Sequence, residues 1–157
     1  MIYVFDCSSL SNILNHYYPD RFPSFWGKFN DMVKNGNLIS VREVRNELTA
    51  RFEENTMNLL IKNNENFFSN PTPDELSFIA QIYSVTHFQQ NLDRKKILSG
   101  GYFADPFVIA KGWIEKGIVI TEEDYKENGA KIPNICNHFE IHCLKLEGFL
   151  IKEDWKF

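Results

Sequence analysis

The sequence predicts an α/β fold in which helices cover both faces of a central, mostly parallel sheet. Short apolar runs at residues 2–5, 38–41 and 118–121 are typical of buried strands. Longer segments with apolar residues at helical spacing separate these runs. Strands that alternate with helices pair in parallel, which gives three layers, α/β/α. The chain has 157 residues, which suits one domain with a sizeable core, and we expect a single domain over residues 1–157.

The first predicted strand ends directly at a carboxylate. Residues 2–5 are apolar, Asp6 follows, and Ser8 is placed to cap a helix that continues through Leu14. In open α/β sheets, ligands bind in the crevice outside the carboxyl ends of the strands. We therefore expect Asp6 at such a crevice, although a simple helix cap has the same appearance in sequence.

The other elements are predicted from periodicity and from helix-breaking residues. Helices are expected at residues 25–33, from Arg42 to about Glu54 with a continuation or restart to Ile61, and from Pro73 to Val85. Residues 91–101 predict a loop, and a helix then begins at Asp105 and ends at Gly117. Residues 134–142 are expected to be helical and residues 143–146 to form a last strand, followed by a charged, aromatic tail.

Acidic residues follow several of these strands. Asp6 ends the first strand, and Glu43 and Glu47 stand one turn apart on the helix after the second. Asp105 begins a later helix, and Glu123 follows the strand ending at residue 121. Because strand carboxyl ends lie at one edge of a parallel sheet, these acids are expected in one crevice. Crowded carboxylates bind cations, oxygen ligands suit Mg²⁺ or Mn²⁺, and such a site suits metal-assisted hydrolysis of a phosphodiester.

Composition sets bounds on location and partners. The net charge of −4 does not by itself favour a nucleic-acid partner. Three cysteines are too few for a disulfide framework and fit a reducing cytoplasm. The amino terminus lacks a basic n-region, and no apolar stretch approaches the roughly 20 residues of a spanning helix. We expect a cytoplasmic protein with no membrane partner.

Four segments carry a family resemblance. They are Ile-Tyr-Val-Phe-Asp-Cys-Ser at 2–8, Ile-Ser-Val-Arg-Glu-Val-Arg-Asn-Glu-Leu at 39–48, Ala-Asp-Pro-Phe-Val-Ile-Ala at 104–110 and Ile-Val-Ile-Thr-Glu-Glu at 118–123. Their order and strand contexts resemble the four acidic motifs of the PIN domain superfamily. Four segments are also similar to the pattern of one PIN-like group of unknown function: Tyr-Tyr-Pro, Phe-Pro-Ser-Phe-Trp, Ala-Asp-Pro-Phe-Val-Ile-Ala and Lys-Ile-Pro-Asn-Ile-Cys. Within the superfamily, the chain thus resembles this group, DUF4411, over nearly its whole length. The resemblance implies a PIN-like three-layer domain.

The resemblance also implies a Mg²⁺- or Mn²⁺-dependent endoribonuclease that cleaves RNA, of the kind found as the toxin in toxin–antitoxin pairs. By position, Asp6, Glu47 and Asp105 match the first three acids and would hold the metal. Glu123 matches the fourth and would hold a second metal or position water. Ser8 and Thr121 would support the carboxylates, and Glu43, one turn before Glu47, leaves the second acid ambiguous. Glu123 stands where Asp is typical, so that carboxylate reaches further.

Two other functions stay open. A catalytically silent PIN-like module would bind RNA or a protein. A haloacid-dehalogenase-like phosphotransfer enzyme would use Asp6 as its nucleophile, but that group usually has a second Asp where this chain has Ser8. We further expect either a homodimer or an antitoxin-binding groove. Its surface would be formed by the aromatic residues 22–26 and a long helical segment after Glu47.

Overall fold

The central sheet has five parallel strands in the order β3-β2-β1-β4-β5. A computed structural model of the chain describes residues 1–62, 64–92 and 103–157, so the loop predicted at 91–101 lies almost wholly outside the described residues. The strands are β1 (Tyr3–Phe5), β2 (Leu38–Val41), β3 (Phe68–Ser69), β4 (Ile118–Ile120) and β5 (Cys143–Leu144). Tyr3 of β1 is paired with Leu38 of β2 and with Ile118 of β4. The first strand of the chain is therefore the central strand of the sheet.

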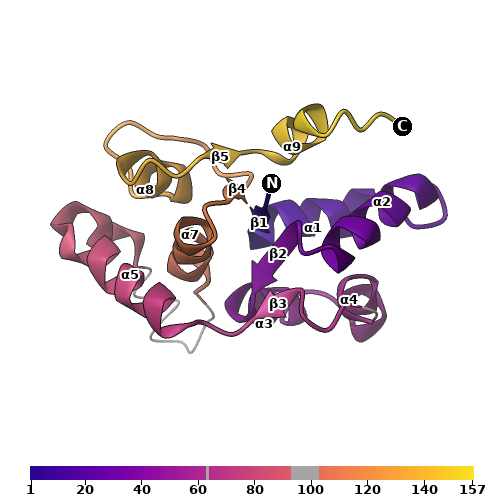
Figure 1. Cartoon of the computed structure of the whole chain (residues 1–157), viewed down its shortest axis with the longest axis horizontal. Coiled ribbons are helices and arrows are strands. Elements are labelled where there is room, and N and C mark those ends of the chain that lie inside the picture. The colour runs from indigo at the N-terminus through magenta and orange to yellow at the C-terminus, as the bar shows by residue number, and fades with distance from the viewer. Residues whose placement is uncertain (63, 93–102) are drawn as a thin grey trace.

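Helices lie on both sides of this sheet, which confirms the predicted three-layer α/β/α architecture (Figure 1). They are α1 (Cys7–His16), α2 (Pro23–Lys34), α3 (Arg42–Thr49), α4 (Glu54–Ile61), α5 (Pro73–Ser84), the 3₁₀ helix η1 (Thr86–Asn91), α7 (Asp105–Ile114), α8 (Ile132–His138) and α9 (Leu146–Lys152). In Figure 1, α5, α7 and α8 lie on one side of the strands, and α1, α2 and α9 lie on the other.

The side chains of β1 show how the core is divided between the two faces. Tyr3 and Phe5 point to one face, because alternate residues of a strand share a side. There the ring of Phe5 packs edge-on against Phe29 of α2 at 6.2 Å and Phe149 of α9 at 5.3 Å between centroids. All of these residues are fully buried, as is Val4 between Tyr3 and Phe5. A strand buried on both faces explains why residues 2–5 form a continuous apolar run.

Some elements differ from the prediction. The helix expected from Arg42 to about Glu54 is α3, which ends at Thr49, and α4 is the restart that was expected to reach Ile61. The strand β3 was missed because two residues carry no readable alternation, and the expected tail contains α9. In α9, Leu146 and Phe149 are buried at a spacing of three residues, which is too short a pattern to distinguish from an irregular segment. The predicted helix at 134–142 instead spans Ile132–His138.

The aromatic stretch at residues 22–26 is part of the core. Phe25 and Trp26 are buried on α2, and the indole Nε1 of Trp26 donates to the carbonyl of Tyr17 at 2.6 Å. Two side chains of the stretch expected at a partner-binding surface therefore belong to the core, and that surface stays a prediction. The helical segment after Glu47 is divided between the end of α3 and α4.

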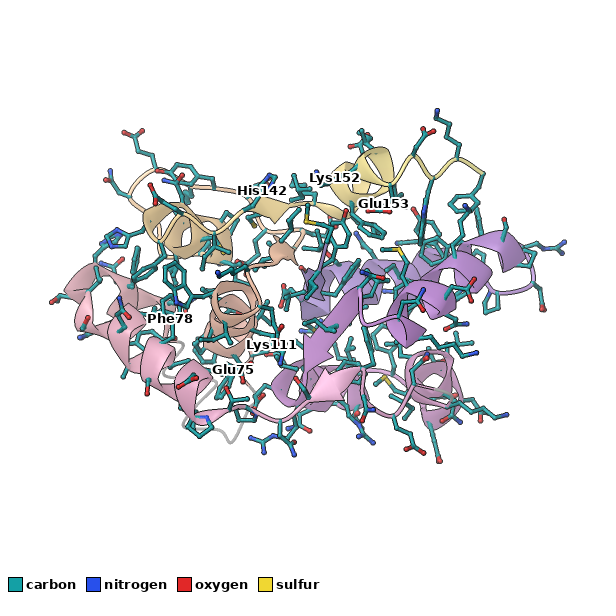
Figure 2. All side chains as sticks on the ribbon, viewed as in Figure 1. Glu75, Phe78, Lys111, His142, Lys152 and Glu153 are labelled. Carbon is teal, nitrogen blue, oxygen red and sulfur yellow. The ribbon has the colours of Figure 1, made fainter. Side chains whose placement is uncertain are left out.

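A buried ion pair joins α5 to α7. The Nζ of Lys111 lies 3.3 Å from Oε1 of Glu75, and both side chains are almost fully buried (Figure 2). The other oxygen of Glu75 accepts from the backbone N–H of Thr72, which completes a capping box at the start of α5. Removing Lys111 would leave the buried Glu75 without its cation, so this pair fixes α5 against α7, which carries Asp105 at its first position.

No helix within residues 1–62, 64–92 and 103–157 has the length and apolar character needed to cross a bilayer.

Candidate active site

The central position of β1 creates a crevice at the carboxyl edge of the sheet. The chain runs from β1 to β2 and β3 on one side of it, and to β4 and β5 on the other. Ligands in open α/β sheets bind where the strand order reverses in this way. Here the structure has a cleft of about 970 Å³. Its lining includes Asp6, Glu47, Asp105 and Glu123, four acids from four segments of the chain.

Asp6 lies at the base of this cleft, held by hydrogen bonds. It is the N-cap of α1, and its Oδ2 accepts from the backbone N–H of Ser8 at 3.4 Å. The same oxygen accepts from the hydroxyls of Ser8 and Thr121, each at 2.9 Å. Burial raises the pKa of Asp6, these donors lower it, and the nearby charge of Glu47 raises it. The expectation that Ser8 caps α1 is wrong, since Asp6 is the cap and Ser8 supports it.

Ser8 and Thr121 connect the first and fourth motifs. Their hydroxyl oxygens are 3.1 Å apart, and Ser8 Oγ also accepts from the backbone N–H of Glu122 at 2.9 Å. Thr121 Oγ1 accepts from the backbone N–H of Glu123 at 3.3 Å. This network fixes the end of β4 beside the start of α1, as the predicted supporting role of both residues requires.

Glu47 and Glu43 occupy different environments on α3. Glu47 is buried and lines the cleft, where its Oε1 accepts from the backbone N–H of Ala104 at 3.0 Å. Glu43 is also buried, but its partner is Arg42 at 2.6 Å, and it is not among the described residues that line the cleft. Its Oε2 has no hydrogen-bond partner among the described residues. Of the two candidates for the second acid, Glu47 is the one at the cleft.

Asp105 is the first residue of α7, and its Oδ2 accepts from the side-chain N–H of Asn91 at 3.0 Å. Burial, followed by the charges of Asp6 and Glu123, raises the pKa of Asp105 to about 7, while the bond from Asn91 opposes the shift. Mutual repulsion of this kind shows that the four acids lie within electrostatic reach of one another.

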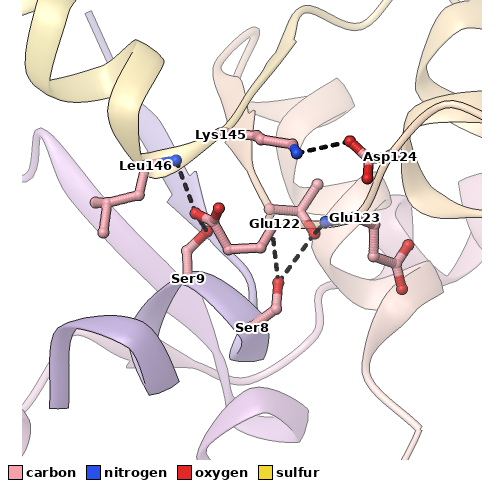
Figure 3. A network of polar contacts seen from close by, with 8 residues as sticks. Ser8, Ser9, Glu122, Glu123, Asp124, Lys145 and Leu146 are labelled. Carbon is pink, nitrogen blue, oxygen red and sulfur yellow. Dashed lines mark hydrogen bonds and ion pairs between the residues drawn. The ribbon is translucent and has the colours of Figure 1, made fainter. Parts of the chain in front are cut away.

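Glu123 and Glu122 point to different helices. The Oε2 of Glu123 accepts from the backbone N–H of Ile132 at the start of α8 at 2.9 Å, which opposes the rise in its pKa caused by burial. Glu122 turns the other way, and its Oε1 accepts from Ser9 Oγ at 3.1 Å and the backbone N–H of Leu146 at 2.8 Å (Figure 3). Beside them, the exposed Asp124 is paired with Lys145 at 2.6 Å (Figure 3). Only Glu123 of these three acids lines the described part of the cleft.

The donor set suits a hard divalent cation that keeps water ligands. No group of three His, Cys, Asp or Glu side chains within the described ranges is arranged to hold a metal ion directly. Mg²⁺ commonly binds through one or two carboxylates and completes its shell with water and substrate phosphate. The carboxylate oxygens, and the raised pKa values of Asp6, Asp105 and Glu123, fit such an ion, because a bound cation would relieve the repulsion.

Several cleft residues were not found from the sequence. Asn91 on η1 contacts Asp105, and the exposed basic residues Arg51 and Lys131 lie on the cleft lining with the amides of Gln89 and Gln90. Lys131 begins the Lys-Ile-Pro-Asn-Ile-Cys segment, but nothing in that segment marks the lysine as a cleft residue. The other four lie in no recognisable motif, so the sequence carried no signal for them.

The fold places four acids in a cleft at the switch point of a parallel sheet, which is the position where open α/β sheets commonly bind ligands. The family model described as "Domain of unknown function (DUF4411)" matches residues 3–157, and the chain belongs to this family. No curated protein and no solved structure matches the chain.

Proposed function

We propose that the protein is a Mg²⁺- or Mn²⁺-dependent endoribonuclease of the PIN type. The observation that carries this proposal is the meeting of Asp6, Glu47, Asp105 and Glu123 in one cleft, where burial and the charges of the other three acids raise the pKa of Asp105 to about 7. The order of these acids along the chain also resembles that of PIN nucleases. A divalent cation bound there would activate water and offset the charge that develops on the phosphodiester.

Each cleft residue has a role that its surroundings support. Asp6, Glu47 and Asp105 would hold the cation, directly or through water. The Oε2 of Glu123 already accepts from the N–H of Ile132. Its other oxygen would therefore accept a hydrogen bond from the attacking water, in preference to holding a second metal ion. Arg51 and Lys131 are exposed on the cleft lining and would contact phosphates on either side of the cleaved bond.

The proposal extends to the biological setting. By the same resemblance, the protein would act in the cytoplasm as the toxin of a toxin–antitoxin pair, with cellular RNA as substrate and an antitoxin as its inhibitor. A homodimer belongs to the same proposal. These statements are tested by co-expressing the product of the neighbouring gene, by measuring inhibition of RNA cleavage, and by sizing the protein at micromolar concentration.

The central experiment measures cleavage of a fluorescent single-stranded RNA by the purified protein with Mg²⁺, with Mn²⁺ and with EDTA. Asp6→Asn and Asp105→Asn should each lower the rate by at least about 100-fold, because a lost metal ligand costs more than the 10- to 100-fold typical of residues behind the ligands. Glu43→Gln is the matched control and should retain most of the activity, since Glu43 lies outside the described lining of the cleft. Undiminished cleavage by Asp6→Asn would contradict the assignment of the active site to this cleft.

Two results would support the other functions. RNA binding without cleavage under every metal condition would indicate the silent module. A hydroxylamine-labile phosphoryl group on Asp6 would indicate phosphotransfer chemistry. Against the second, Oδ2 of Asp6 already accepts three hydrogen bonds, which stabilise the carboxylate and lower its nucleophilicity.

A further inference from the structure

Asn91 makes three hydrogen bonds that meet in one carboxamide. The hydroxyl of Tyr83 on α5 donates to its Oδ1 at 2.9 Å. Its Nδ2 donates to Oδ2 of Asp105 and to the carbonyl oxygen of Ala130, each at 3.0 Å. One side chain thus connects α5, the first residue of α7 and the segment before α8.

These partners determine which way the carboxamide faces. Asp105 and Ala130 both present acceptors, so they require the NH₂ end of the amide. A flipped amide would place Oδ1 against two other oxygens and lose both bonds. Tyr83 reinforces this orientation, because burial and the charge of Asp105 raise the pKa of its hydroxyl and keep the donor proton in place. The N–H of Asn91 therefore points at Asp105 in the folded protein.

The carboxylate of Asp105 needs such a restraint. It faces the charges of Asp6, Glu123 and Glu47, and this repulsion favours side-chain conformations that turn Asp105 away from the cleft. A donor on a fixed side chain opposes that rotation. Residues that hold metal ligands in this manner govern both the orientation and the affinity of the site.

We propose that Asn91 is a positioning residue that holds the Asp105 carboxylate toward a divalent cation in the cleft. This inference rests on the proposed function, because it presupposes a cation bound by Asp6 and Asp105. The role of Asn91 precedes RNA binding and should be measurable with the metal alone.

The test is direct binding of Mn²⁺ to the full chain. Binding is measured as the loss of the free-ion signal in electron paramagnetic resonance. Asn91→Ala should weaken Mn²⁺ binding by about 10-fold or more. The matched control is His87→Ala on the same 3₁₀ helix. His87 contacts the carbonyl of Gly129 at 3.0 Å and so also ties η1 to the segment before α8, but it touches none of the four cleft carboxylates. Its Mn²⁺ affinity should equal that of the wild type.

Thermal unfolding without metal separates positioning from mere structural support. Equal losses of thermal stability in the two variants, with Mn²⁺ binding lowered only in Asn91→Ala, would support the inference. Unchanged Mn²⁺ affinity in Asn91→Ala would overturn the inference and leave the proposed function intact. Wild-type protein that binds no Mn²⁺ would overturn both. Asn91→Ser, which keeps a small donor, replaces Asn91→Ala if the latter does not fold, and should bind Mn²⁺ less tightly than the wild type.

Discussion

The four cleft carboxylates differ in the hydrogen-bond donors that reach them. Asp6 receives three side-chain or backbone donors on one oxygen, Glu47 receives the backbone N–H of Ala104, and Glu123 receives that of Ile132. Asp105 has the N–H of Asn91. Hydrogen bonds to a carboxylate lower its pKa, whereas burial and like charges raise it. Residue-scale predictions follow from removing one of these influences at a time.

Removal of the Thr121 hydroxyl should disturb Asp6 without changing the shape of the core. Thr121→Val removes a donor to Asp6, so the pKa of Asp6 should rise further and the acid limb of the activity profile should move to higher pH. A hydrogen bond to a charged group contributes about 1.5–3 kcal/mol, so the shift of the acid limb should be large enough to measure. Activity from pH 5 to 9 is the measurement.

Thr49→Val is the matched control for Thr121→Val. Thr49 is exposed at the end of α3 and donates to the carbonyl of Arg45 at 2.8 Å. Its activity profile should overlay that of the wild type. An unshifted profile in Thr121→Val would contradict the supporting role of that hydroxyl.

The stability of the metal-free protein should depend on pH through Asp105. Its pKa is raised to about 7 in the folded state, so the folded protein binds the proton more tightly than the unfolded chain does. This stability is fully present below the unfolded pKa of about 4 and is lost as the pH rises through about 7. In EDTA, the melting temperature should therefore fall between pH 4 and 8, and millimolar Mn²⁺ should restore part of it at pH 7.5.

Asp105→Asn tests the origin of this slope, because it removes the titrating group at nearly constant size. The melting temperature of that variant should fall less steeply with pH. Asp124→Asn, at an exposed position paired with Lys145, should keep the wild-type slope. A wild-type slope in Asp105→Asn would assign the effect to other groups.

At the scale of elements, the position of α7 depends on a glycine. A Cβ added to Gly112 would lie 2.6 Å from Cγ2 of Val119 on β4, closer than real contacts allow. Gly112→Ala should therefore destabilise the fold by about 1–3 kcal/mol through overpacking. Gly27 on α2 has no atom within 4 Å of the same added Cβ, so Gly27→Ala should instead stabilise by about 0.5–1 kcal/mol. Urea denaturation measures the change in unfolding free energy of each variant. Changes of the same sign in the two variants would contradict the packing argument.

The sequence indicated the elements that bear the cleft more clearly than it indicated the contacts among them. The run at residues 2–5 and the periodicity after Asp105 predicted β1 and α7, because a strand buried on both faces and a helix opened by Asp-Pro have strong local signals. Short elements such as β3 and α9 carry too few residues for any periodicity.

The choice between Glu43 and Glu47 shows where sequence reasoning stops. Both lie on one helical face, and only the rotation of α3 against the sheet places Glu47 at the cleft. That rotation is set by tertiary packing. Asn91 was missed for the same reason, since its partners lie 8, 14 and 39 positions away along the chain.

The whole molecule carries a net charge of −4, so binding of the proposed RNA substrate would depend on cations. Added monovalent salt weakens protein–RNA association, because the counterions released on binding gain less entropy at higher salt concentration. At constant ionic strength, millimolar Ca²⁺ should nevertheless strengthen binding of a short RNA, because an oxygen-bound ion would cancel cleft charge. Fluorescence anisotropy measures this affinity. Asp105→Asn should reduce the Ca²⁺ effect, and weaker wild-type binding in Ca²⁺ would contradict the proposed site.

The contacts that build the cleft also set when it can exist during synthesis. The bond from Thr121 to Asp6 spans 115 positions, and that from Ala104 to Glu47 spans 57. At a translation speed of about 5–20 residues per second, β1 waits on the order of 10 seconds for its β4 neighbour to be made. Until then, the amino-terminal acid has neither its threonine donor nor the strand beside it. A ribonuclease assembled in this order would be unable to cut the messenger from which it is being translated.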